Sequence, residues 1–143
     1  MKASVTTSGG LAAYQKRLVV LSKGAWREPL YERIGKRLHE LVEKGWETRT
    51  DPYGQAWKPT QQPNPILEET GEMRGKVAHE VVSNGITIKV DDWKAIFHQY
   101  GTKHKLVQRI VPRRMLPSGE LPDAWVEAIQ EEADAFFDEW LAG

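Results

Sequence analysis

The residues that most often carry catalysis or bind metals are scattered along this chain. Of its four histidines, only His98 and His104 lie near each other, on either side of a glycine turn. No carboxylate stands at helical or turn spacing from them to complete a metal site. Adjacent acid pairs such as Glu68-Glu69 point apart on a helix or strand and do not form a paired-carboxylate centre. We therefore expect no catalytic residue, no metal site, no cofactor and no enzymatic activity.

A basic segment is the most concentrated charged feature of the chain. Residues 99–116 contain no acid and five basic side chains: Lys103, Lys105, Arg109, Arg113 and Arg114. Because such a segment can neutralise a few phosphates, our alternative prediction is a nucleic-acid-binding accessory protein that uses residues 103–114. The whole chain, however, balances 20 basic against 20 acidic residues, and a net charge of zero does not favour bulk attraction to nucleic acid. We expect at most non-specific contact with passing DNA.

An acidic segment follows directly, since residues 117–143 contain eight acids and no base. Unlike charge blocks suit contact between two faces of one fold or between neighbouring copies, although they are also compatible with two solvated surfaces. We expect the basic segment to contact the acidic segment of a neighbour or of its own chain. An Arg113→Glu or Arg114→Glu change should then weaken assembly more than folding. The five basic residues are interface candidates, together with four acids: Glu127, Glu131, Asp134 and Asp138.

Three amphipathic helices are predicted. The first begins after Ser8, repeats apolar side chains at helical spacing and ends at Gly24. The second begins near Pro29, a residue favoured in a first helical turn, and ends at Gly45. The third covers Pro122–Leu141, where apolar side chains recur at three- and four-residue spacing.

A β-hairpin is the clearest strand prediction. Asn84-Gly85 favours the positive φ angles of a type I′ turn and joins two apolar strands within residues 76–90. Lys2–Thr7 and Leu106–Met115 are weaker strand candidates, and prolines limit the second to a sheet edge. The predicted fold is α+β, with a small antiparallel sheet (the hairpin plus edge strands) packed against two or three long amphipathic helices.

Length and composition indicate the number of domains and the cellular compartment. The 143 residues fit a single domain, residues 1–143. Cysteine is absent, which excludes disulfides. No apolar run approaches the roughly 18 residues that a membrane-spanning helix needs, and the first ten residues lack the apolar core of a signal peptide. We therefore expect a protein made in the cytoplasm, with no membrane contact.

Residues 50–65 form a proline-rich loop with two aromatic side chains, Tyr53 and Trp57, which we take as interface candidates. Proline removes backbone donors and breaks helical and strand patterns. Loops of this length in compact domains are usually functional or disordered, and aromatic side chains argue against disorder because they need to pack. Trp57 either packs on its own domain or docks with the loop on a neighbouring subunit.

The stretch Ala95–Pro117 divides into a corner and an arm. In the corner, which a short helix forms, we expect Phe97 and Tyr100 to pack against the domain. Gly101 then lets the chain turn. Residues 102–117 form the basic arm, which adapts to a partner.

Five motifs follow one another along most of residues 9–143. They are the N-terminal helical region, the loop DPYGQAWKPT, the turn ILEETGEMRGKV that enters a strand, the segment AIFHQYGTK after the hairpin, and PRRMLP before the last helix. In this order they resemble the phage virion morphogenesis family, also called tail completion proteins, and the related head–tail joining proteins. The chain departs from the family pattern at Arg114, where a proline is expected, and in the basic insert 103–111.

The resemblance implies a structural virion assembly protein of a tailed phage. It implies a small α+β subunit that forms a homo-oligomeric ring, hexameric or larger, at the neck or the head-proximal end of the tail. The ring would complete the tail or join it to the head. The implied partners are further copies of the chain, the tail tube or tail terminator, and neck or connector proteins, and the implied location is the virion.

Overall fold

The computed structural model describes residues 15, 18–19, 21–59, 73–104 and 107–142. Its elements, in chain order, are α2 (Arg27–Thr48), the 3-10 turn η1 (Arg74–Lys76), β1 (Val77–Val82), β2 (Gly85–Val90), α3 (Ala95–Tyr100), β3 (Thr102–His104), β4 (Val107–Ile110) and α4 (Asp123–Ala142). The predicted strand Lys2–Thr7 and most of the first predicted helix lie outside the described residues.

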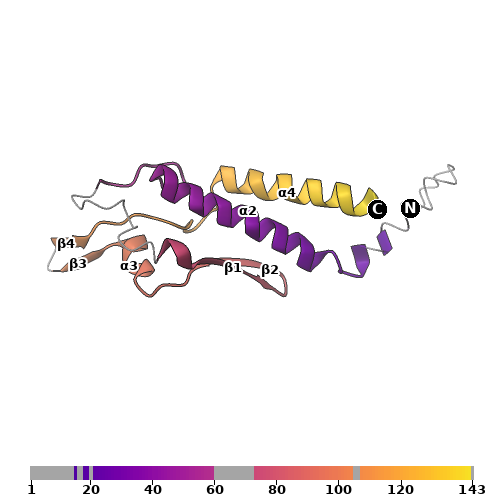
Figure 1. Cartoon of the computed structure of the whole chain (residues 1–143), viewed down its shortest axis with the longest axis horizontal. Helices are drawn as coiled ribbons and strands as arrows, with labels where there is room; N and C mark the ends of the chain where they lie inside the picture. Colours follow the sequence, from indigo (N-terminus) through magenta and orange to yellow (C-terminus); the bar gives the residue numbers. More distant parts are fainter. Residues whose placement is uncertain (1–14, 16–17, 20, 60–72, 105–106, 143) are drawn as a thin grey trace, which may run out of the picture.

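Helix α2 is the central layer of the fold. Helix α4 packs along one side of α2, and the hairpin of β1 and β2 packs along another (Figure 1). The short helix α3 and the second hairpin, β3 and β4, lie toward the C-terminal end of α2 (Figure 1). The α+β prediction is confirmed, with helices packed on a small antiparallel sheet.

Helix α2 forms because apolar side chains recur every four residues and are all buried: Leu30, Ile34, Leu38, Val42 and Trp46. The predicted end at Gly45 is wrong, since the helix continues to Thr48 and ends where Arg49 adopts a left-handed conformation with φ 56°. Gly45 is needed for another reason. A Cβ atom there would lie 3.1 Å from the backbone oxygen of Thr50, because the chain folds back closely over the last turn.

Helix α4 confirms the predicted C-terminal helix. It buries Trp125, Ala128 and Phe136 against the rest of the chain. Phe137 extends this contact, because its ring lies 5.6 Å from that of Trp26, just before α2. The apolar stripe of α4 therefore packs on the helix that the second predicted stripe forms.

The first hairpin is confirmed, but its turn differs from the prediction. Val82 pairs with Gly85, so the two loop residues are Ser83 and Asn84. None of these residues has a positive φ, so the predicted type I′ turn at Asn84-Gly85 is wrong. The observed register places Val81 opposite Ile86. Pairing across Asn84-Gly85 would place the polar Ser83 opposite Ile86. The observed register instead pairs two apolar side chains, Val81 and Ile86, and this pair explains why the register is preferred.

The predicted edge strand within Leu106–Met115 does not join this hairpin. Strands β3 and β4 pair with each other in a separate two-stranded sheet, with a register shift between Thr102 and Lys103. Gly101 turns the chain into this sheet with φ 73°, as predicted. The basic segment is therefore a second hairpin followed by an extended segment, residues 111–117.

Candidate assembly surface

Helix α3 presents its apolar side chains to solvent. Ile96, Phe97 and Tyr100 of α3 are 60%, 40% and 61% exposed, and their spacing of three and four residues places them on one side of the helix. Trp93, in the turn before α3, is 76% exposed, and its ring centroid lies 6.0 Å from that of Phe97. We call these four residues the α3 face. The prediction that Phe97 and Tyr100 pack against the domain is wrong, because the inward positions of this short helix are taken by other residues. Exposed apolar patches of this kind mark interaction sites.

Asp92 fixes the turn that precedes α3. Its carboxylate is buried, and Oδ1 accepts a hydrogen bond from the backbone N–H of Lys94 at 2.9 Å. The other oxygen, Oδ2, lies 3.7 Å from Nζ of Lys94 and 3.9 Å from Nζ of Lys76. Two ammonium groups thus compensate the buried negative charge. These contacts of Asp92 hold the start of α3 in place.

Gln99 fastens α3 to the extended segment that follows the second hairpin. Its side-chain Nε2 donates a hydrogen bond to the backbone oxygen of Leu116 at 2.7 Å, and its Oε1 accepts hydrogen bonds from the N–H groups of Met115 and Leu116 at 2.8 and 3.2 Å. Gln99 is only 8% exposed, so these bonds satisfy a buried amide. Sequence reasoning missed this residue, although the motif AIFHQYGTK contains it, because one neutral amide produces neither a charge block nor a periodic pattern.

The aromatic residues of the proline-rich loop contact their own chain. Trp57 is 6% exposed, stacks edge-on against Trp46 with ring centroids 5.8 Å apart, and donates from Nε1 to the backbone oxygen of Arg114 at 2.9 Å. It occupies the core, where it cannot meet a neighbouring subunit. The Tyr53 hydroxyl lies 2.8 Å from the backbone oxygen of Ser118, while its ring stays 40% exposed.

The two arginines of PRRMLP have different roles. Arg113 donates from Nε and Nη2 to the backbone oxygens of Lys58 and Pro59, at 2.8 and 3.1 Å, and so ties the extended segment to the loop. The side chain of Arg114 is exposed. Lys103 is also exposed, on β3. The side chain of Arg109 and all of Lys105 lie outside the described part of the chain.

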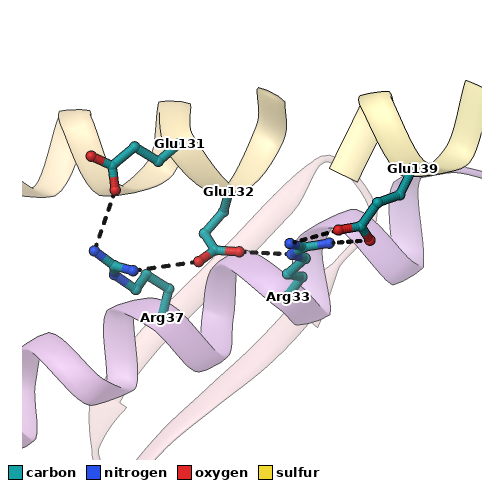
Figure 2. A network of polar contacts seen from close by, with 5 residues as sticks. All are labelled: Arg33, Arg37, Glu131, Glu132 and Glu139. Carbon is teal, nitrogen blue, oxygen red and sulfur yellow. Dashed lines mark hydrogen bonds and ion pairs between the residues drawn. The ribbon is translucent and has the colours of Figure 1, made fainter. Parts of the chain in front are cut away.

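Acidic side chains of α4 pair with α2 (Figure 2). Arg33 binds Glu132 at 2.7 Å and Glu139 at 2.8 Å, and these two hydrogen-bonded carboxylates raise the pKa of the Arg33 guanidinium. Arg37 lies 3.4 Å from Glu131 and 3.5 Å from Glu132. One predicted interface acid, Glu131, therefore has a partner within its own chain.

The other three predicted interface acids, Glu127, Asp134 and Asp138, are exposed on α4. Within the described residues, none of the three makes an ion pair. The structure thus separates the acids of α4 into a set that fastens α4 to α2 and a set that faces solvent. Exposed basic side chains therefore lie near α3, and exposed acidic side chains lie on the solvent side of α4.

The described residues contain no group of three or more histidine, aspartate or glutamate side chains placed to hold a metal ion. Among the helices that the structure describes, none is long and apolar enough to cross a membrane.

The described residues define a small α+β protein with an exposed aromatic surface at α3 and a second hairpin within the basic segment. The family model of the phage virion morphogenesis family matches residues 12–123. The chain belongs to this family. No curated protein and no solved structure gives a significant match.

Proposed function

We propose that the chain is a structural subunit of a tailed-phage virion, which forms a homo-oligomeric ring at the neck or the head-proximal end of the tail. There it completes the tail or joins it to the head. Its partners are further copies of itself, the tail tube or terminator, and neck or connector proteins. It has no enzymatic role and needs no cofactor.

The observation that carries this proposal is the α3 face, in a chain that belongs to a family of virion morphogenesis proteins. Trp93 and Tyr100 are of the residue types that most often dominate binding energy at interfaces, and both are more than half exposed. With roughly 200 Å² per side chain, the four exposed fractions correspond to roughly 450 Å² of surface. That area lies within the range of about 300–600 Å² that the largest apolar patch of a monomer covers, and such patches are often functional.

The nucleic-acid alternative uses Lys103, Lys105 and Arg109. It is less favoured, because Arg113, a fourth member of the basic segment, is engaged by two backbone oxygens of the loop. Binding to DNA at low salt that falls when Lys103, Lys105 and Arg109 are changed to alanine would support this alternative. Absence of binding at low salt would remove it.

The test is complementation of a phage that lacks this gene. Ile96→Asp places a charge in the middle of the α3 face, and a lost hot spot of about 2–4 kcal/mol corresponds to roughly a 30- to 1,000-fold weaker association. We expect few infectious particles, with unjoined heads and tails or tails of aberrant length in electron micrographs. Ser83→Asp, the same charge in an exposed turn, is the matched control and should complement fully. Normal infectious particles in the absence of the protein would refute the proposal.

A further inference from the structure

A shallow apolar groove runs between strand β2 and helix α4. It encloses about 400 Å³. One wall consists of Ile86 and Ile88 of β2, and the other consists of Trp125 and Ile129 of α4. Leu121, which is 48% exposed, also lines the groove. We call this feature the β2–α4 groove.

The apolar surface continues past the groove onto α4. Val126 is 47% exposed and precedes Ile129 by three residues, so the two side chains share a side of the helix. The same helix also carries two exposed acids, Asp123 and Glu127, but each is two residues from Trp125, so both lie on the solvent side of α4 and outside the groove wall. The groove is therefore apolar, and the solvent side of α4 next to it is acidic.

The α3 face has the opposite form and the opposite charge. Its side chains project from a helix whose buried residues, Ala95 and Gln99, hold the other side against the chain's own core. Its neighbours Lys103 and Arg114 are exposed and basic. The face points away from the core, and within the described residues it stays exposed.

We infer that the α3 face of one copy docks in the β2–α4 groove of the next copy. This inference rests on the proposed ring and names the two surfaces that join its subunits. Two unlike surfaces on one chain form a heterologous interface, and such an interface generates a closed ring when its rotation closes. An isologous dimer would instead bury the same surface from both subunits.

Charge and area both select a second copy as the occupant. The basic residues beside the α3 face meet the exposed acids on the solvent side of α4, next to the groove, and unlike charges at the rim of an interface fix orientation and exclude wrong partners. A standard interface buries about 800 Å² on each partner. The α3 face supplies roughly half of that area, and the second hairpin, which follows α3 directly, lies beside it to extend the contact.

The absence of cysteine permits a direct cross-linking test, because every thiol in a variant is an introduced one. Ile96→Cys labels the α3 face, and Leu121→Cys labels the groove. The two single variants are mixed and treated with a flexible bis-maleimide reagent, both as purified protein and in assembled particles. Trp93→Cys with Val126→Cys samples the same interface at a second position. Ser83→Cys, exposed in the first hairpin turn, is the control.

We expect cross-linked dimers from the mixture of Ile96→Cys and Leu121→Cys, and a ladder of covalent oligomers from the double variant. Neither single variant alone, nor Ile96→Cys mixed with Ser83→Cys, should give more than a few per cent of dimer. Dimers from Ile96→Cys alone would show an isologous contact and overturn the inference. Particles that contain the protein but show no cross-link at either pair would overturn it too, while leaving the ring intact. A protein that is monomeric in solution and in particles would refute the proposed ring itself.

Discussion

Replacing Gly35 with alanine tests how closely the first hairpin packs on α2. Gly35 is buried in the middle of the helix, and a Cβ atom there would lie 2.5 Å from Cδ2 and 2.9 Å from Cγ of His79 on β1. Cγ is the root of the imidazole ring and cannot move without a change of rotamer. The ring is also held at Nε2, which lies 3.0 Å from Oε2 of Glu32. The added methyl group must therefore displace the ring or the strand.

Two opposing free energies decide the sign of this change. In a helix interior, alanine is favoured over glycine by about 1 kcal/mol. Overpacking of a close contact costs about 1–3 kcal/mol, and displacing the His79 ring also weakens its contact with Glu32. We expect the free energy of unfolding to fall by about 1–2 kcal/mol in Gly35→Ala. Urea unfolding followed by circular dichroism measures this change, with an unchanged m-value as the check that both states remain comparable.

A second variant isolates the contact with His79. In a His79→Ala background the clash is gone, so Gly35→Ala should stabilise the protein by up to about 1 kcal/mol. The double-mutant cycle should then give a coupling energy of about 2–3 kcal/mol between positions 35 and 79. A Gly35→Ala protein that is as stable as the parent, or one that is destabilised equally with and without His79, would contradict this packing.

Three further predictions concern the parts that hold the assembly surface. Gln99→Leu leaves the backbone groups of Met115 and Leu116 without their side-chain partner. It should lower the free energy of unfolding, measured by urea unfolding, by about 2–3 kcal/mol. Unchanged hydrogen exchange at the Met115 amide would contradict this role. Arg113→Ala should destabilise by about 1–2 kcal/mol, whereas Arg114→Ala should stay within about 0.5 kcal/mol, and equal effects would contradict the contacts of Arg113 with the loop. Burial, followed by the nearby charge of Arg113, lowers the pKa of His98 in the folded state. As the pH falls, His98 therefore binds a proton in the unfolded chain before it does so in the folded chain, and the free energy of unfolding should decline below about pH 6.5. The decline should be smaller in His98→Gln. Identical pH profiles of the two proteins would contradict the shift.

The long elements could be predicted from the sequence because each repeats its pattern several times. Helices α2 and α4 carry apolar stripes over five or six turns, so their presence could be predicted, although Gly45 led to a wrong end for α2. The first hairpin could be predicted because two apolar strands flank turn residues. Its register could not, since Val81 opposite Ile86 is a tertiary preference that outweighed the local turn preference of Asn84-Gly85.

The candidate surface could not be predicted, for two physical reasons. Helix α3 has only six residues, which is too short for periodicity to show which side is buried. Phe97 and Tyr100 were expected to be buried because aromatic side chains usually are. Gln99 occupies the inward position instead, and its amide forms hydrogen bonds with the extended segment. Charge patterning identified the acids of α4 but could not separate Glu131, which pairs with Arg37, from Glu127, which faces solvent.

The buried polar residues that fix α3 affect how strongly the α3 face would bind a partner. Asp92 and Gln99 fix the helix before any partner arrives, so its aromatic side chains are presented on an ordered backbone. Binding then costs less conformational entropy than it would for a mobile segment. A variant that removes a residue fixing α3 should therefore behave differently from a variant that disrupts the α3 face. Gln99→Leu should lower both the free energy of unfolding and the affinity between subunits, whereas Ile96→Asp should lower the affinity alone, because Ile96 is 60% exposed and contributes little to the fold.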